Sequence, residues 1–352
     1  MAVTQDKPLA EGGEEAGTAA RAPSMRDVAD LAGYSHQTVS RVLSGHPNVR
    51  ARTRLRVMAA IQDLGYRPNL AARALATGSS QTVGVVVLNG TLHGPSSMLY
   101  AIEEAAQFAG YGVTVASVRG FDRTLLRRAI ARLADQAVDG VIVVAPLASV
   151  RDALEELPQD TPSVIVDGDP DDCSALVRVD QTLGARRATE HLLTLGHSTV
   201  WHVAGPADWP HSQGRVAGWK AALAAAGAEE TVPLPGDWSA ESGYRAGQLL
   251  ARMPDVTAVF AANDSMALGA LRALSERGRR VPEDVSIVGF DDIPEAAYLS
   301  PPLTTVRQDF HRVGLRSLAL LLDQIAERAN PPHDVVIEPE LIVRLSTAPP
   351  PL

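Results

Sequence analysis

Apolar side chains recur at helical spacing in three short segments near the start of this chain. The segment SMRDVADLAG predicts a helix that Ser24 caps and Gly33 ends. Ser35 is expected to cap a second helix, and a third is predicted over residues 52–64. The positions predicted to face inward are Val39, Val42 and Leu43 on the second helix and Leu55, Met58, Ala59 and Ile61 on the third.

The pattern changes after Gln81, where short apolar runs alternate with helical segments. These runs are TVGVVVL, VTVASV, GVIVVA, SVIVD, TVWHVAG, AVFAAN and VSIVGFDD. Continuous Val and Ile runs separated by helices are typical of parallel strands buried on both faces. Residues 81–352 are therefore expected to form two doubly wound α/β lobes, and the sequence shows no internal repeat.

Two segments fall outside these patterns. Residues 1–23 are rich in Ala, Gly and Glu and lack a hydrophobic period, so we expect a disordered tail. The segment YRPNLAARALATGSS, between the helices and the body, is expected to be a hinge that ends in a flexible Gly-Ser stretch.

Composition narrows the class of protein. The 352 residues exceed the usual single domain of about 100–200 residues, and 45% hydrophobic residues are enough for a large core. Cys173 is the only cysteine, which excludes an internal disulfide and a multi-cysteine metal site and fits a reducing compartment. No signal-peptide pattern is present, and no stretch approaches the roughly 20 apolar residues of a membrane helix. We therefore expect a cytoplasmic protein without a membrane partner.

The net charge of −9 hides an asymmetry along the chain. Residues 21–80 contain nine arginines and three aspartates, so this head carries +6 and the rest of the chain carries −15. A compact basic head on an acidic body predicts that the head binds a polyanion. The alternative is a solvated helical face.

The first helices also have the order of a helix-turn-helix, in which a glycine-containing turn joins two short helices and a third packs behind them. The polar first turn of the second helix then enters the DNA major groove. His36 and Gln37 lie in that turn and Arg41 shares a face with Gln37; Gln can pair with adenine and Arg with guanine. The alternative is a surface helix of an ordinary three-helix cap. Residues suited to phosphate oxygens are Ser35, Thr38, Asn48 and Thr53.

Long motifs identify a family resemblance. The stretch MRDVADLAGYSHQTVSRVLSGHPNVRARTRLRVMAAIQDLGYRPNLAARALATGSS resembles the DNA-binding headpiece of the lactose-repressor/galactose-repressor (LacI/GalR) family of transcriptional regulators. The segments HGPSSMLYAIEEAA, GDWSAESGY, ANDSMALGALRAL and VGFDDIPEAAYLSPPLTTVRQDF are similar to its lactose-repressor branch. Only the tail before Ser24 and the last few residues fall outside the resemblance.

The resemblance implies an N-terminal all-α helix-turn-helix headpiece and an α/β two-lobed, periplasmic-binding-protein-like (type I) effector domain. The implied division is a tail (1–23), the headpiece (24–68), a hinge helix and linker (69–80) and an effector-binding and dimerisation domain (81–352). One lobe would contain residues 81–179 and about 310–337, and the other would contain residues 181–307 with the final strand.

On the DNA side, the resemblance makes His36, Gln37 and Arg41 the base readers. The lactose-repressor branch has tyrosine at the position of His36, so a different operator is expected. The hinge helix NLAARAL would form on operator binding, and Leu75 would wedge into the minor groove and bend the duplex. The alternative for Leu75 is an ordinary packing position in that helix. Further implied contacts are Tyr66 and Asn69 with phosphates and Ala72 in the minor groove.

In the body, the resemblance places a small-molecule effector between the lobes. Ligands of open α/β sheets bind beyond the carboxyl ends of strands, where Asp167, Asn263 and Asp291 stand. Such residues can instead cap the following helix, a role for which Asp264 and Asp292 are the stronger candidates. The implied effector-binding residues are Leu92, Gly94, Ser96, Met98, Asp167, Trp209, His211, Arg215, Trp238, Asn263, Asp291, Gln308 and Phe310.

The chemistry of these residues suits a sugar. Charged and amide groups bind adjacent hydroxyls, and Trp238 offers a stacking face, unless it is a plain surface aromatic. Trp209 and His211 stand where the lactose-repressor branch has small serines, which reshapes the sugar subsite. His211 either titrates near neutral pH or only packs.

These observations predict a sequence-specific transcriptional repressor that a small sugar, expected to be a galactoside, releases from a pseudo-palindromic double-stranded operator. Release would follow from differential affinity for two arrangements of the lobes. The alternatives are the same fold responding to a β-glucoside, another disaccharide or a purine corepressor. A sugar-binding transport receptor is a further alternative, against which the headpiece argues.

Enzyme motifs are missing from the sequence, which has no GxSxG elbow, Gly-Lys phosphate loop or HExxH. Asp291 and Asp292 are adjacent, so an extended strand would point them to opposite faces and disfavour a glycosidase pair. We expect no enzymatic activity, no cofactor and no metal. The chain ends at VRLSTAPPPL without the leucine-rich helix that joins two dimers in tetrameric relatives, so we expect a homodimer.

Overall fold

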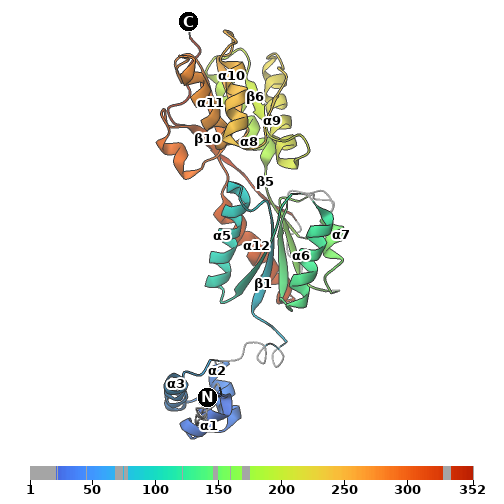
Figure 1. Ribbon diagram of the computed structural model, residues 1–352, viewed down its shortest axis with the longest axis vertical. Helices are drawn as coiled ribbons and strands as arrows, with labels where there is room; N and C mark the ends of the chain where they lie inside the picture. The colour runs from blue at the N-terminus through green and yellow to red at the C-terminus, as the bar shows by residue number, and fades with distance from the viewer. Residues whose placement is uncertain are drawn as a thin grey trace, which may run out of the picture. The chain divides into compact units, whose positions relative to one another are not determined.

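The computed structural model describes residues 21, 23–44, 46–67, 74, 78–120, 122–145, 150–158, 160–168, 175–327 and 334–351. The chain divides between Gly78 and Ser79 into two compact units, a helical head and an α/β body (Figure 1). The predictions of a disordered tail and a hinge helix, and those for Asn69, Ala72 and Leu75, lie outside the described residues.

The head contains α1 (Met25–Ala32), α2 (His36–Leu43) and α3 (Ala51–Leu64). Ser24 caps α1 by accepting the Asp27 N–H, and the Asp27 carboxylate accepts the Ser24 N–H at 2.7 Å in return. Ser35 caps α2 by accepting the Thr38 N–H at 3.2 Å. Both predicted serine caps are confirmed, and each satisfies a backbone N–H in the first turn of its helix.

The inward face of α3 differs from the sequence prediction. Val39 and Val42 on α2 are buried as predicted, but on α3 the buried residues are Val57 and Ala60. Apolar residues lie on more than one face of this helix, and packing against α1 and α2 buries only the face that carries Val57 and Ala60. The prediction was therefore wrong for three residues that are exposed, Leu55, Met58 and Ala59.

The described part of the body contains two six-stranded sheets, and all seven predicted strands are present. The order in the first sheet is β11-β5-β4-β3-β1-β2, with β1 Thr82–Leu88, β2 Gly112–Val118, β3 Gly140–Val144, β4 Ser163–Val166, β5 Leu176–Val179 and β11 Asp334–Ile337. The order in the second is β12-β10-β9-β8-β6-β7, with β6 Trp201–Ala204, β7 Leu234–Pro235, β8 Ala258–Ala261, β9 Ser286–Asp291, β10 Thr304–Arg307 and β12 Glu340–Ile342. Among these strands only the β10–β12 pair is antiparallel.

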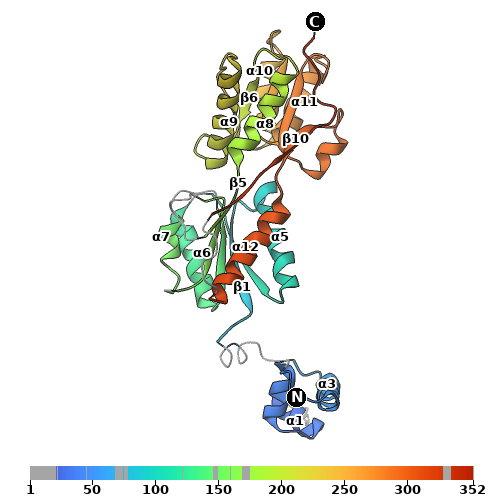
Figure 2. The same ribbon diagram turned by 180° about the vertical axis from the view of Figure 1, so that it is seen from behind.

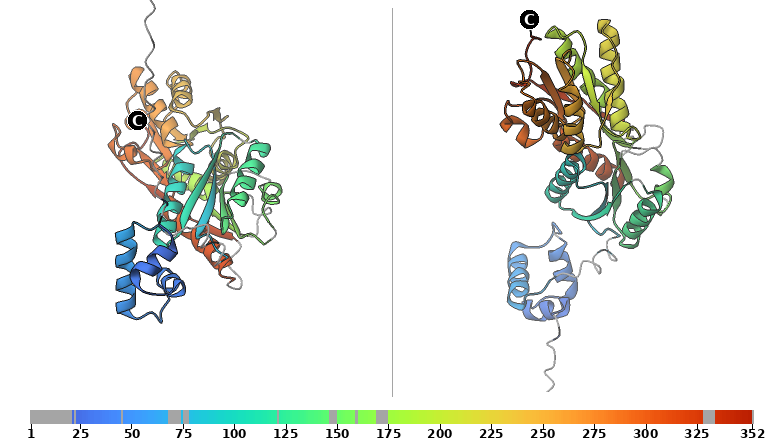
Figure 3. Two further views of the ribbon diagram at one scale, coloured as in Figure 1. Left: turned by 60° about the horizontal axis from the view of Figure 1, so that its bottom comes forward. Right: turned by 45° about the horizontal axis from the view of Figure 1, so that its top comes forward.

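Helices cover both faces of each sheet (Figure 3). Around the first sheet lie α5 (His93–Phe108) and α12 (Phe310–Ile325) on one face and α6 (Arg123–Asp135) and α7 (Arg151–Leu154) on the other. Around the second lie α8 (Gln181–Thr194) and α9 (Pro210–Ala226) on one face and α10 (Ala240–Leu250) and α11 (Asp264–Glu276) on the other, with a 3₁₀ turn η2 over Pro294–Tyr298.

The chain passes between the lobes three times, after β5, after β10 and after β11 (Figure 2). This connectivity confirms the predicted composition of the two lobes. Each sheet is buried on both faces by its own pair of apolar clusters. Because each lobe has a separate core and only three connections join them, relative motion of the lobes disturbs little packing.

Candidate functional site

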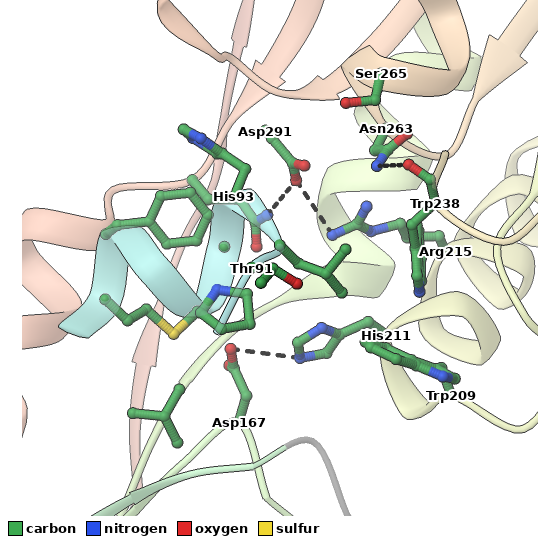
Figure 4. Close-up of a pocket in the computed structure, with 17 residues that line it drawn as sticks. Thr91, His93, Asp167, Trp209, His211, Arg215, Trp238, Asn263, Ser265 and Asp291 are labelled. Atoms are coloured by element: carbon green, nitrogen blue, oxygen red, sulfur yellow. Dashed lines mark hydrogen bonds and ion pairs between the residues drawn. The ribbon is translucent and has the colours of Figure 1, made fainter. Parts of the chain in front are cut away.

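A cavity of about 150 Å³ lies between the two lobes, beyond the carboxyl ends of the strands (Figure 4). The predicted effector residues that line it are Leu92, Gly94, Met98, Asp167, Trp209, His211, Arg215, Trp238, Asn263, Asp291, Gln308 and Phe310. Residues of the wall that the sequence analysis missed are Thr91, His93, Pro95, Val144 and Ser265. Most of these are chain neighbours of predicted residues, and that adjacency was the available signal.

Ser96 does not reach this cavity. Its hydroxyl donates to the carbonyl oxygens of Leu92 at 2.9 Å and His93 at 3.0 Å, and the side chain is exposed on α5. It lines a separate surface hollow with Tyr100 and His311.

A closed ring of four polar side chains lies at one wall of the cavity, and three of them, Arg215, Asp291 and Gln308, line it. Arg215 Nε donates to Gln181 Oε1 at 2.9 Å, and Gln181 Nε2 donates to Gln308 Oε1 at 2.8 Å. Gln308 Nε2 donates to Asp291 Oδ1 at 2.7 Å, and Arg215 Nη2 lies 3.5 Å from the same oxygen. Since all four residues are buried, each hydrogen bond holds its neighbour in place before a ligand arrives.

Arg215 is the centre of this wall. Its guanidinium is 3.7 Å from the centroid of the Phe290 ring and 5.3 Å from that of Trp238, and it also donates to the carbonyl of Ala262. Burial raises the pKa of the Asp291 carboxyl, and the charge of Arg215 opposes this shift. The pair therefore presents a positioned charge of each sign to polar groups of a ligand.

Two tryptophans give the cavity an apolar aromatic surface beside this charged wall. Trp209 and Trp238 meet edge to face with ring centroids 5.6 Å apart. Asn263 donates from Nδ2 to the Trp238 carbonyl at 3.1 Å, and Gly205 is needed because a Cβ there would lie 2.3 Å from the indole. The indole N–H of Trp238 is buried and has no hydrogen-bond partner in the described part of the chain. It is thus available to an acceptor on a ligand.

Asp167 and His211 face each other across the two lobes (Figure 4). Asp167 lies in the first lobe, where its Oδ1 accepts the Val179 N–H at 3.0 Å. Its Oδ2 is 3.3 Å from Nε2 of His211, which belongs to α9 of the second lobe. Neither of these two atoms makes a hydrogen bond within the described ranges, so a ligand hydroxyl could bridge them.

The capping roles differ from the prediction. Asn263 caps α11 by accepting the Met266 N–H at 2.8 Å, so it combines capping with its position on the cavity. Asp264 is wholly buried and accepts from the Thr305 hydroxyl at 2.6 Å and the Ile293 N–H at 2.9 Å. Asp292 pairs with Arg307 and Arg344, away from the cavity that Asp291 lines. Capping by Asp264 or Asp292 was therefore wrong, whereas Asp291 and Asp292 do point to different sides, as predicted.

Asp264 gives the protein a testable pH dependence. Burial, with a contribution from the nearby Asp291, raises the pKa of Asp264 from 3.8 to about 8. Between these values the folded chain binds a proton that the unfolded chain has lost, so this group lowers stability as the pH rises. Asp264→Asn removes the titration, and its melting temperature should exceed that of the unchanged protein by more at pH 8.5 than at pH 5. Thermal denaturation at both values checks this, and a pH-independent difference would contradict it.

The predicted DNA-binding residues of the head lie mostly on its surface. Side chains of Ser35, His36, Gln37 and Arg41 are exposed along α2. Asn48 is exposed as well, while Thr38 and Thr53 are half-buried. Tyr66 differs, because its side chain is only 8% exposed and packs in the head's core. These contacts with DNA stay predictions.

The described ranges contain no helix long and apolar enough to cross a membrane. They also contain no group of three or more His, Cys, Asp or Glu side chains suited to a metal ion.

Comparison with known proteins covers nearly the whole chain. Residues 24–69 match the model described as bacterial regulatory proteins, lacI family, and residues 189–347 match the periplasmic binding protein-like domain. The HTH-type transcriptional regulator CelR of Thermobifida fusca is 39% identical, over 93% of this chain and 98% of the relative. The lactose operon repressor of Escherichia coli K12 is 36% identical, over 93% and 91%. The repressor PurR of Vibrio parahaemolyticus is 32% identical, over 91% and 97%.

Solved structures give the same picture. The lac repressor dimer bound to operator and the anti-inducer ONPF is 34% identical with a TM-score of 0.86, over 93% of this chain and 100% of that one. The complex of the transcriptional regulator CelR with cellobiose is 36% identical with a TM-score of 0.69, over 92% and 99%.

Proposed function

This chain belongs to the lacI family of bacterial regulatory proteins, and on that premise we propose that a β-linked glucose disaccharide releases it from its operator. It is a DNA-binding transcriptional regulator and not an enzyme. The proposal concerns the effector, its binding residues and the assembly. As a regulator of bacterial genes, it would act in the cytoplasm as a homodimer on a pseudo-palindromic operator.

The observation that carries the effector proposal is the pairing of an aromatic wall with a charged wall in one cavity. Trp209 and Trp238 provide stacking surface, and Arg215, Gln308 and Asp291 provide donors and acceptors beside it, with the Arg215 guanidinium 5.3 Å from the centroid of the Trp238 ring. A β-glucosyl unit carries equatorial hydroxyls around a ring with two apolar faces, so both walls are used. The axial hydroxyl of a galactosyl unit makes one of those faces polar. The relative CelR, solved with cellobiose, supports the same choice.

Operator release by defined ligands tests the proposal. Operator DNA selected by the purified protein is labelled, and its dissociation is followed by fluorescence anisotropy at fixed salt. Cellobiose is expected to release it, whereas lactose should require a higher concentration. Release by galactosides alone would replace the β-glucoside assignment. Tighter operator binding with hypoxanthine would make the protein a corepressor-dependent regulator like the purine-responsive relatives.

Trp209 offers a sharper test of the stacking surface. Trp209→Ala is expected to weaken cellobiose binding about tenfold, equivalent to about 1.4 kcal/mol, because one aromatic face is lost. Trp209→Phe keeps a face and should retain most of the affinity. Isothermal titration of both variants measures the effect, and equal affinity of Trp209→Ala and the unchanged protein would remove this residue from the sugar subsite.

A further inference from the structure

One carboxylate, that of Asp139, holds the residues that lead into β1. Its Oδ1 accepts the Ser80 N–H at 2.6 Å and the Ser80 hydroxyl at 2.9 Å. Its Oδ2 accepts the Ser79 hydroxyl at 2.5 Å and the Gln81 N–H at 2.9 Å. The Asp139 N–H in turn donates to the Thr82 carbonyl at 2.8 Å. The Asp139 carboxylate thus accepts four hydrogen bonds from three consecutive residues, which fixes their backbone to the first lobe.

The same segment is fixed from its other side. Gln81 has a φ of 50°, in the left-handed region, and its carbonyl accepts the Gly112 N–H at 2.8 Å. Asp139 precedes β3 and Gly112 begins β2, and these strands flank β1 in the sheet. The direction in which the chain leaves the body is therefore set by both neighbours of β1. A strained backbone angle at Gln81 persists because these contacts hold it.

β1 joins this anchor to the effector cavity. The strand runs from Thr82 to Leu88, is buried beyond its first residue and lies inside the first sheet. The cavity wall that includes Thr91 and Leu92 follows directly after its carboxyl end. The anchor lies at the opposite end, about 23 Å away at the usual rise of a strand. A central buried strand is stiff, so a rotation of the first lobe moves both ends together.

We propose that Asp139 is a positioning residue for operator binding, which clamps Ser79–Gln81 to the first lobe and passes the lobe's orientation to the linker of the head. Without this clamp, the lobe would still rotate on effector binding, but Ser79–Gln81 would no longer keep a fixed direction relative to the lobe. The effector-free protein would then lose operator affinity and approach the affinity of the effector-bound form.

Asp139→Ala tests this proposal, with Asp135→Ala as the matched control. Asp135 is the exposed last residue of α6, four positions earlier, so the control removes the same charge from the same edge of the lobe. Operator affinity without effector is measured by anisotropy, cellobiose affinity by tryptophan fluorescence, and stability by thermal melting. Asp139→Ala should lower operator affinity about tenfold while cellobiose affinity stays within about twofold. Asp135→Ala should change neither.

Equal operator affinities for the two variants would overturn the proposal. A loss of operator binding accompanied by an equal loss of cellobiose binding and of melting temperature would also overturn it, since that is a folding defect. Should Asp139→Ala not fold, Asp139→Asn keeps one acceptor oxygen and should give an intermediate loss. The inference rests on the proposed effector only for the sugar measurement: failure of cellobiose to bind the unchanged protein would reject that effector, while the operator measurement would still decide the role of Asp139.

Discussion

Arg215→Ala is expected to abolish operator release by the effector and to lower the free energy of unfolding by about 3–5 kcal/mol. Arg215 is only 3% exposed, and its guanidinium is held by Gln181, Ala262 and Asp291. Removal leaves the Asp291 carboxylate buried without its cation and opens the ring of four polar side chains. Denaturant unfolding measures the stability, and operator anisotropy with cellobiose measures the response.

Two further variants distinguish the loss of stability, caused by an unpaired buried charge, from the loss of effector binding. Adding Asp291→Asn to Arg215→Ala removes the unpaired charge, so it should restore part of the stability but not the effector response. Arg245→Ala serves as the control, because Arg245 is an exposed arginine of α10 whose ion pairs with Asp237 and Glu241 contribute little. A normal response to effector in Arg215→Ala would contradict the role assigned to the cavity's charged wall.

Gln37→Ala is expected to weaken operator binding by about 1–3 kcal/mol and to relax the preference for one base in each half-site. Gln37 is exposed in the first turn of α2, and the cap made by Ser35 fixes that turn. A glutamine side chain can make two hydrogen bonds with adenine, and alanine makes none. Anisotropy with the selected operator and with its single-base variants measures both effects.

Thr53→Ala provides the comparison for Gln37. A residue that contacts phosphate should weaken binding to every sequence by the same factor, without changing the preferred base. If Gln37→Ala behaved in this uniform way, the base-reading role would pass to His36 or Arg41. Measurements at two salt concentrations should give the same salt dependence for both variants, because neither substitution removes a charge.

The relation between sequence and structure differs between local and distant features. Serine caps, glycine stops and Val-rich runs act within a few residues, so the helices of the head and seven strands of the body were predictable. The strands that were missed are short and carry polar or charged residues, such as LVRV in β5 and TTVR in β10. For them, pairing with neighbours outweighs the local pattern.

The cavity shows how far a family resemblance reaches. The resemblance named twelve of the residues that line the cavity, because each position of a matching motif carries over individually. It did not give the contact between Gln181 and Gln308, which lie 127 positions apart in the sequence. Nor did it give the approach of His211 to Asp167, which depends on how the two lobes close on each other.

By itself, therefore, the sequence determined the helices of the head, seven strands of the body, its two-lobed α/β class and the charge asymmetry of head and body, since each follows from local periodicity or composition. The tertiary structure decided which apolar face of α3 is buried, that Asn263 and not Asp264 caps α11, and which acid holds the residues before β1. Asp139 shows the physical reason most directly. Its four hydrogen bonds reach residues 58 to 60 positions away, and only the parallel pairing of β1 with β3 brings those residues within reach.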